Sequence, residues 1–216
     1  MKVEIWSDVV CPWCYIGKRR FENALEQFDH RGEVEVEFRS FELNPNADPA
    51  EQGNLEEALA RKYRLSPEQA HALNARVVDA AAGEGLHYRL DIAKRGNTFD
   101  AHRLIHLAAT MGLQGAMKER LLAAYFTEGK PIGDQDTLVE LAAEVGIDAE
   151  RARTVLADGS FGDQVREDER EATELGITGV PFFVINRRYG VSGAQPPGLM
   201  LKALTAGWES SEAAEG

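Results

Sequence analysis

The chain has 216 residues, a formal net charge of −12 and 44% hydrophobic residues. These values are typical of an ordinary soluble globular protein with a sizeable core. The acidic charge argues against nucleic acids and anionic membrane surfaces as partners, because both select clustered lysine and arginine. No stretch approaches the ~20 apolar residues that a membrane-spanning helix needs.

The start of the chain favours a cytoplasmic location. Residues 1–6 enter a strand pattern at once and lack the basic, apolar and cleavage regions of a secretory signal peptide. If this is the natural start, we expect the protein to stay in the cytoplasm. Cellular reductants keep thiols largely reduced there, so a disulfide in this chain is expected to be transient.

The N-terminal segment predicts a strand, a helix and a second strand. Val3 and Ile5 alternate with polar residues, which indicates a strand over residues 2–6. Apolar residues then recur at helical spacing as far as Phe28. Residues 33–41 alternate again, with valine and phenylalanine against glutamate. The segment therefore reads as a β-α-β unit.

Only helical patterns follow over residues 44–163, after prolines break the chain. The clearest helix start is Ser66-Pro67-Glu68-Gln69, where serine caps, proline fills the first turn and glutamine completes a capping box. The charge block 166–171 is typical of a solvated helix face.

Strand character returns late in the chain. Residues 181–185 and 189–191 flank a polar turn, which predicts an antiparallel hairpin. Pro196-Pro197 then opens a last helix. The small and acidic segment 209–216 predicts a frayed tail.

This order of elements predicts an α/β fold of the thioredoxin type, β-α-β followed by β-β-α, interrupted by a large all-helical insertion. We assign residues 1–43 and 164–208 to a discontinuous thioredoxin-like domain. Residues 44–163 form the helical insertion, and residues 209–216 form a flexible acidic tail.

Both cysteines of the chain lie in Cys11-Pro12-Trp13-Cys14, at the predicted change from strand to helix. A helix N-terminus favours the thiolate, which is the reactive form of cysteine. We therefore predict that Cys11 is the attacking thiol, unshielded, easily ionised and facing the loop that carries Pro181. Cys14, one turn further on, is the predicted resolving thiol.

Three other interpretations of the two cysteines stay open. A static disulfide closes too small a ring to constrain the unfolded chain much. A zinc site needs more ligands, and His102 and His106 share a helix face but lie far from Cys14 in the sequence. Two inert buried thiols fit poorly with proline at a helix start.

Gly179-Val180-Pro181 is the second informative segment. A proline that enters a buried strand donates no hydrogen bond to the sheet. We expect Pro181 to begin the strand after a cis peptide bond and Val180 to offer free backbone groups to a substrate chain. The predicted substrate-binding residues are Pro12, Trp13, Val180 and Pro181.

These motifs resemble the DsbA-like thioredoxin superfamily, and in particular its FrnE-type branch. That branch is related to 2-hydroxychromene-2-carboxylate isomerases and kappa-class glutathione transferases. Ser7-Asp8-Val9-Val10, Asn97–Arg103 and Ser192–Pro196 also resemble the branch, so the similarity spans nearly the whole chain. The resemblance implies a thiol–disulfide oxidoreductase that exchanges dithiols through its CPWC motif, without a bound cofactor or metal.

The resemblance also suggests residues on the side of the site that takes substrate or glutathione. Helix capping and tight turns explain the same residues equally well. The candidates are Asn97, Asp100, His102, Gly193, Ala194 and Gln195.

The chain departs from its relatives at informative positions. The isomerases and transferases place a serine where Cys11 stands, which favours dithiol chemistry here. Trp13 replaces the histidine of DsbA, so we expect a less oxidising couple. Ile5 stands where thioredoxins carry a buried carboxylate, and Asp8 or Glu4 is the candidate proton acceptor for Cys14.

Three functions therefore compete at this stage. The first is a cytoplasmic thiol–disulfide oxidoreductase with protein or small-molecule thiols and disulfides as partners and glutathione as a candidate co-substrate. The second is a glutathione-dependent isomerase or transferase of a small aromatic or polyketide-like substrate, with Trp13, Phe99 and Met111 lining a pocket. The third is a zinc-stabilised or scaffolding protein.

Overall fold

A four-stranded sheet forms the centre of the computed structural model, which describes residues 1–48 and 55–215. The strand order is β2-β1-β3-β4; β1 and β2 run parallel, and the other pairs are antiparallel. The late hairpin therefore completes the sheet begun by the N-terminal strands, as predicted. The strands are β1 (Lys2–Ser7), β2 (Glu35–Ser40), β3 (Phe182–Ile185) and β4 (Tyr189–Ser192).

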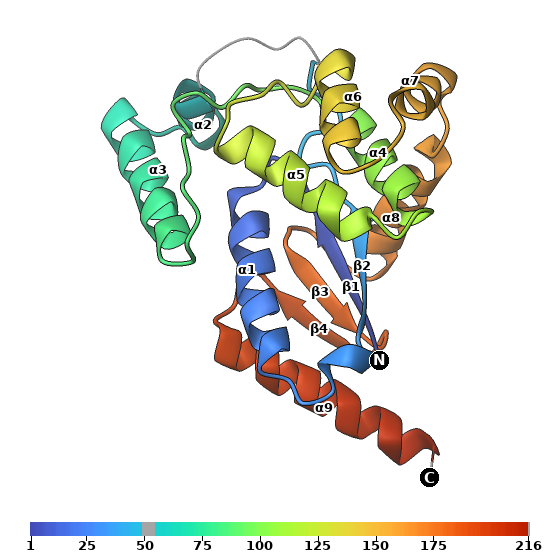
Figure 1. Cartoon of the computed structure of the whole chain (residues 1–216). Helices are drawn as coiled ribbons and strands as arrows, with labels where there is room; N and C mark the ends of the chain where they lie inside the picture. The colour runs from blue at the N-terminus through green and yellow to red at the C-terminus, as the bar shows by residue number, and fades with distance from the viewer. Residues whose placement is uncertain (49–54, 216) are drawn as a thin grey trace.

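Helices cover both faces of this sheet and one of its ends. In Figure 1, α1 and α9 pack along one face, α8 lies beside β2 at the right of the sheet, and α3 lies alongside α1. Helices α2 and α4 to α7 lie above the end where α1 begins. The helices are α1 (Pro12–Glu26), α2 (Leu55–Tyr63), α3 (Pro67–Ala82), α4 (Phe99–Ala109), α5 (Gln114–Phe126), α6 (Gln135–Glu144), α7 (Ala149–Asp158), α8 (Gly162–Glu174) and α9 (Pro197–Glu215), with a 3-10 turn at Arg31–Glu33.

Alternation along the strands separates two apolar layers. Ile5 and Phe183 are paired across β1 and β3 and belong to the large core under α1, where the Phe21 and Phe183 rings stack 5.5 Å apart. Trp6 and Val184 point to the other face and pack with Ala172 of α8. Side chains alternate between faces along a strand, so one short sequence supplies both layers.

The inserted helices share the core of the sheet. The side-chain amide of Gln114, at the start of α5, accepts from the backbone N–H of Phe38 at 2.9 Å and donates to its carbonyl at 3.0 Å. These bonds satisfy the backbone of Phe38 on the free edge of β2. Buried residues of α4 to α7 and of the sheet form one cluster. The domain boundaries assigned from the sequence remain a prediction.

Several local predictions are confirmed. Ser66 forms the complete capping box with Gln69 at the start of α3. Asn186 and Arg187 both take left-handed conformations in the turn between β3 and β4, which matches the twist of a tight hairpin. No helix of the described residues is long and apolar enough to cross a bilayer.

One prediction needs correction. The charge block on α8 is not wholly solvated, because Asp168 is only 1% exposed and contacts Arg39, Ser40 and His106. Buried Val165, Asp168 and Ala172 recur at the spacing of one helix face. In the structure α9 continues as far as Glu215, and Gly216 lies outside the described residues; the flexibility expected for segment 209–216 stays a prediction.

Candidate active site

The dithiol lies at the N-terminus of α1. Cys11 is the residue that caps the helix, in an extended conformation, and Pro12 is the first helical residue. The Cys14 N–H donates to the Cys11 carbonyl at 3.0 Å, and the Tyr88 hydroxyl donates to the Pro12 carbonyl at 2.7 Å. Both cysteines are free thiols. The local sequence thus fixes the two sulfurs within one turn, with Cys11 at the end of the helix that attracts negative charge.

Cys11 also faces the loop of Pro181, as predicted. Its Sγ lies 3.5 Å from the Val180 carbonyl oxygen and donates to it, and the Val180–Pro181 peptide bond is cis. The Gly193 N–H donates to the Pro181 carbonyl at 2.8 Å, which links this loop to the segment before α9. Residues far apart in the sequence therefore meet at the thiol.

The prediction of an unshielded Cys11 is wrong. The residue is 4% exposed, because helices and loops of the insertion pack over the start of α1. Cys11 nevertheless lines a cavity of about 570 Å³, together with Pro12, Trp13 and Val180. We call this space the dithiol cavity. The sulfur therefore borders this cavity rather than open surface.

The walls of the dithiol cavity are mostly apolar. Trp13, which is 41% exposed, contributes a large aromatic surface beside the thiol. Lys62 and Arg95 are the cationic residues of the lining. The apolar wall residues that α2, α3 and α5 contribute are Leu55, Ala58, Leu59, Leu73, Val77, Tyr125 and Phe126. Such a lining suits an apolar substrate better than a highly charged one.

Two residues expected in this pocket lie elsewhere. Phe99 sits beneath the guanidinium of Arg166, 4.3 Å from its ring centre, and Met111 is 37% exposed. Neither lines the dithiol cavity. Helical spacing alone gave no information on which end of the insertion faces the dithiol.

The motif around Asn97 has partners within the protein. Asn97, one residue before the N-cap of α4, accepts from the N–H of Phe99, the first residue of that helix, at 2.8 Å. Asp100 accepts from Arg103 at 2.7 Å and from Gln135 at 2.8 Å. Buried His102 lies 3.3 Å from an Asp8 oxygen. None of Asn97, Asp100 and His102 lines the dithiol cavity.

Residues 193–195 behave as a turn that supports the Pro181 loop. Ala194 accepts a hydrogen bond from Arg20 at 2.6 Å, and Gln195 donates to the Ser192 carbonyl at 2.8 Å. Gly193 has a φ of +79°, which favours glycine. The segment contacts Pro181 and not the cavity.

The carboxylates considered as proton acceptors have other partners. Asp8 is buried and accepts from the Val9 and Leu43 backbone N–H groups at 2.7 and 2.8 Å. Burial opposes its ionisation, but the hydrogen bond and charge of His102 and the hydrogen bond from the Leu43 N–H hold its pKa below the ordinary value. Glu4 pairs with Arg39 and Arg187 on the α8 side of the sheet. A low pKa makes Asp8 a weak proton acceptor.

Burial raises the pKa of the Cys14 thiol well above its ordinary value, and a hydrogen bond with Cys11 raises it further. The positive charge of Lys118 acts in the opposite direction. The two thiols are therefore unequal. Cys14 is a poor spontaneous nucleophile and suits a resolving role in which its proton is removed only when needed.

His102 and His106, the two histidines considered as zinc ligands, also have partners within the protein. His106 Nε2 lies 3.0 Å from Asp168 of α8 and 3.1 Å from Ser40 Oγ. Within residues 1–48 and 55–215, no three histidine, cysteine, aspartate or glutamate side chains are grouped to hold a metal ion.

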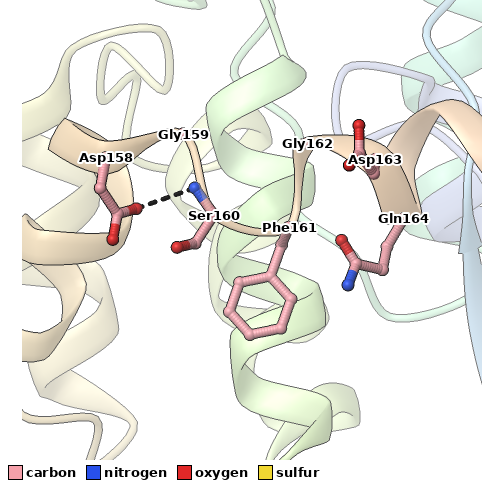
Figure 2. A pocket seen from close by; sticks show the side chains of 7 residues that line it. All are labelled: Asp158, Gly159, Ser160, Phe161, Gly162, Asp163 and Gln164. Atoms are coloured by element: carbon pink, nitrogen blue, oxygen red, sulfur yellow. Dashed lines mark hydrogen bonds between the residues drawn. The ribbon is translucent and has the colours of Figure 1, made fainter.

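A second hollow, of about 550 Å³, lies beside the loop between α7 and α8. Figure 2 shows its lining, from Asp158 to Gln164, with the Asp158 carboxylate turned back to accept the Ser160 N–H at 2.8 Å. It shares no lining residue with the dithiol cavity. We therefore place the candidate active site at the dithiol.

Comparison with known proteins agrees with the fold described above. Residues 2–205 match the family described as DSBA-like thioredoxin domain. The chain belongs to this family.

Relatives support the assignment along nearly the whole length. The Bacillus subtilis (strain 168) protein YwbO, described as uncharacterized, is 30% identical over 204 residues, which cover 94% of this chain and 95% of YwbO. The crystal structure of a probable DsbA oxidoreductase from Streptomyces coelicolor is 49% identical, with a TM-score of 0.93, and the match covers 97% of this chain and 90% of that one.

A more distant structure shares the fold of this DsbA-like chain. The cytosolic disulfide reductase DsbM from Pseudomonas aeruginosa, solved with GSH, is 19% identical, with a TM-score of 0.67. The match covers 97% of this chain and all of DsbM. At this identity the likeness concerns the thioredoxin-type architecture with inserted helices.

Sequence patterns missed one buried charged residue near the dithiol of this DsbA-like protein. Lys118 of α5 is 1% exposed, and its Nζ donates to the Ser7 carbonyl at 3.1 Å. A signal was present, because Lys118 precedes Leu121, Leu122 and Tyr125 by three, four and seven positions, on the face of the apolar stripe.

Gly17 provides a test of the contact between α1 and the Pro181 loop. A Cβ atom there would lie 2.9 Å from Pro181 Cγ and 3.4 Å from Ala194 Cβ. We expect Gly17→Ala to destabilise the DsbA-like fold by about 1–2 kcal/mol, because overpacking outweighs the gain in helix propensity. Urea unfolding measures the change.

Gly115 is the matched control, since it also lies in a helix but a Cβ atom there meets nothing within 4 Å. We expect Gly115→Ala to be neutral or stabilising by up to ~1 kcal/mol. Equal stability changes in the two variants would contradict the close contact at Pro181.

Proposed function

We propose that this protein is a thiol–disulfide oxidoreductase that works through Cys11 and Cys14. The observation that carries the proposal is the position of Cys11: its sulfur lines the dithiol cavity and lies 3.5 Å from the Val180 carbonyl. The Cys11 thiolate attacks a substrate disulfide, and one substrate sulfur leaves as a thiolate. Cys14 then displaces the second substrate sulfur and closes the Cys11–Cys14 disulfide. The reverse sequence oxidises a dithiol.

The apolar lining of the dithiol cavity favours a substrate with apolar groups beside its disulfide. Trp13 and the walls from α2, α3 and α5 contact the apolar part, and the backbone of Val180 is placed to pair with an extended segment. Both a protein segment and a small molecule fit this description. Because Cys11 and Cys14 themselves form the redox-active pair, the proposed reaction needs no bound cofactor. Glutathione serves as a co-substrate that returns the two cysteines to their starting redox state.

A trapping experiment tests the assignment. The Cys14→Ala variant cannot resolve the mixed disulfide, so we expect substrates from a cell extract to stay linked to Cys11 until a reductant is added. Mass spectrometry of the released thiols identifies them. The Cys11→Ala, Cys14→Ala double variant is the control, and equal capture by both variants would contradict a role for Cys11.

A cytoplasmic site of action is part of the proposal. The disulfide reductase DsbM, which shares the fold, is described as cytosolic. In cell fractions, we expect this protein with the soluble cytoplasmic enzymes and its dithiol largely reduced. Recovery of the protein outside the cytoplasm, with both cysteines oxidised, would contradict this part.

A further inference from the structure

We propose that Tyr88 is a positioning residue whose hydroxyl group stabilises the Cys11 thiolate. It acts through the peptide group that joins Pro12 to Trp13. The inference deepens the proposed function, because this thiolate begins the exchange. Tyr88 lies between α3 and α4, within the inserted helices, whereas Cys11 caps α1 of the thioredoxin-type core. The insertion therefore supplies part of the redox site rather than only covering it.

The first support is a direct hydrogen bond between Tyr88 and the backbone of the CPWC motif. The Tyr88 hydroxyl donates to the Pro12 carbonyl at 2.7 Å. Pro12 is the first residue of α1, so this carbonyl lies in the helical turn between the two thiols. A carbonyl oxygen has two lone pairs and can accept this bond together with a helical one. The contact therefore adds a partner to the helix without replacing one.

The second support is the packing that fixes Tyr88 in this position. Its side chain is 6% exposed, and its ring stacks on Phe126 with the ring centres 4.5 Å apart. The ring also stacks on Tyr15 of α1, at 6.1 Å between centres. The next residue, Arg89, donates its N–H to the Phe126 carbonyl at 2.6 Å. These contacts hold the hydroxyl oxygen in place, as a preorganised donor requires.

Ionisation of Cys11 changes the hydrogen bonds that its sulfur can form. The thiol donates to the Val180 carbonyl at 3.5 Å, and within the described part of the chain its side chain accepts no capping hydrogen bond from α1. A thiolate has no proton to donate, so it needs N–H donors instead. Cys11 is the N-cap of α1, and an N-cap side chain accepts from the N–H of the second or third helical residue.

Trp13, the second helical residue, provides the N–H that remains for the thiolate. Pro12 has no N–H, and the Cys14 N–H already donates to the Cys11 carbonyl at 3.0 Å. The Trp13 N–H belongs to the same peptide group as the Pro12 carbonyl. A donor at that carbonyl polarises the peptide group, which strengthens the hydrogen bond that its N–H donates. Tyr88 therefore stabilises the thiolate through the backbone rather than by a bond to the sulfur.

Other titratable groups face the dithiol, and none of them changes when only the Tyr88 hydroxyl is removed. Cys14 shares α1 with Cys11, and Lys118 of α5 interacts electrostatically with both sulfurs. Burial raises the pKa of the Tyr88 hydroxyl, so it stays a protonated donor at neutral pH. The remaining groups around Tyr88 and in the cavity lining are Tyr15 and Arg19 of α1, Lys62 of α2, Arg95, and Tyr125 of α5.

Alkylation by iodoacetamide measures the thiolate, because the ionised form of a cysteine is the nucleophile. The Cys11 sulfur bonds to carbon, and iodide leaves with the electron pair. Mass spectrometry of quenched samples gives the rate at Cys11 separately from the rate at Cys14. Between pH ~4 and pH ~10, the rate at Cys11 in the wild-type protein should rise and then reach a plateau where this thiol is fully ionised.

In Tyr88→Phe we expect the profile to move to higher pH and to reach the same plateau. Below the midpoint, the rate should be lower by about two- to fourfold, which corresponds to a charge-assisted hydrogen bond weakened by about 10–30%. The variant keeps the ring and its stacking contacts. A hydroxyl with only a structural role would change the height of the plateau and leave the midpoint in place. An unchanged midpoint would therefore overturn the proposal.

Tyr15→Phe is the matched control. Tyr15 is also buried and stacks on Tyr88, but its hydroxyl donates to the Glu119 carboxylate at 2.6 Å. This variant loses one buried hydroxyl without changing a contact to the backbone of the CPWC motif, so its midpoint should match that of the wild-type protein. A shift as large as that in Tyr88→Phe would overturn the proposal, because the loss of either hydroxyl would then have the same effect.

A parallel assay separates this inference from the proposed function. Ellman's reagent is an aromatic disulfide that releases a coloured thiolate when a thiolate attacks it. If the wild-type protein is alkylated at Cys11 but does not exchange with Ellman's reagent, the proposed function fails. If it exchanges and the alkylation profiles of the wild-type protein and Tyr88→Phe coincide, only the role of Tyr88 fails.

Discussion

Replacing Cys11 with serine is expected to lower the rate of disulfide exchange by about 10³-fold or more, because a hydroxyl replaces an ionisable thiol. Cys14 cannot take over its role. That thiol is 3% exposed, does not line the dithiol cavity and has a pKa raised by burial. Reduction of insulin disulfides and of Ellman's reagent, followed at neutral pH, measures the loss.

Cys14→Ser is the matched variant, and its defect should differ in kind. Cys11 remains in contact with the cavity, so we expect the first attack to proceed at a rate close to that of the wild-type protein. The reaction should then stop at the mixed disulfide. Equal residual activity in Cys11→Ser and Cys14→Ser would contradict the division of roles. Glutathione-dependent turnover retained in Cys14→Ser would favour the isomerase or transferase alternative.

Replacing Asp168 with alanine should give the largest change in stability, about 3–5 kcal/mol, because it leaves buried charges without their partner. The Asp168 carboxylate accepts from Arg39 at 2.8 Å, from the Ser40 N–H at 2.8 Å and from His106 at 3.0 Å. These contacts join α8 to β2 and α4. Urea unfolding at neutral pH measures the free energy of unfolding.

Glu167→Ala is the control for Asp168→Ala. Glu167 is the preceding residue of α8, but its side chain is exposed and pairs with exposed Arg170. An exposed pair contributes little, so we expect a change within about 0.5 kcal/mol. A similar loss of stability in both variants would contradict a specific role of Asp168, because it would show that any substitution on α8 destabilises the protein.

The same carboxylate should make stability depend on pH. Burial opposes the ionisation of Asp168, but the hydrogen bonds from His106 and Ser40 and the charge of Arg39 lower its pKa overall. A lowered pKa in the folded state stabilises the protein above the unfolded pKa of about 3.9, and this contribution is lost as the pH falls. In Asp168→Ala, the free energy of unfolding should therefore fall less steeply with acidification below pH ~5.

Local patterns were sufficient to predict the frame of this fold. Alternation identified the strands, and Pro12 and Ser66 marked helix starts that the structure contains. The contact between Cys11 and the Pro181 loop was expected from the thioredoxin-type arrangement, and it forms because β1 ends and β3 begins at the same end of the sheet. Each of these features depends on a few neighbouring residues or on the known connectivity of such sheets.

Features that depend on tertiary packing were not predictable in this way. The burial of Cys11 results from helices that pack over it from distant parts of the sequence. Asp168 looked solvated within a run of charges, and Lys118 looked like an ordinary surface lysine. Their burial depends on which helix face meets the sheet, and propensity does not determine that.

The most direct test is a redox titration of the wild-type protein in glutathione buffers, with acid quenching and mass spectrometry of both cysteines. We expect one reversible transition between the Cys11–Cys14 dithiol and its disulfide, with any glutathione adduct on Cys11 as an intermediate. The absence of an intramolecular disulfide at every ratio of oxidised to reduced glutathione, in a folded protein, would contradict the central claim.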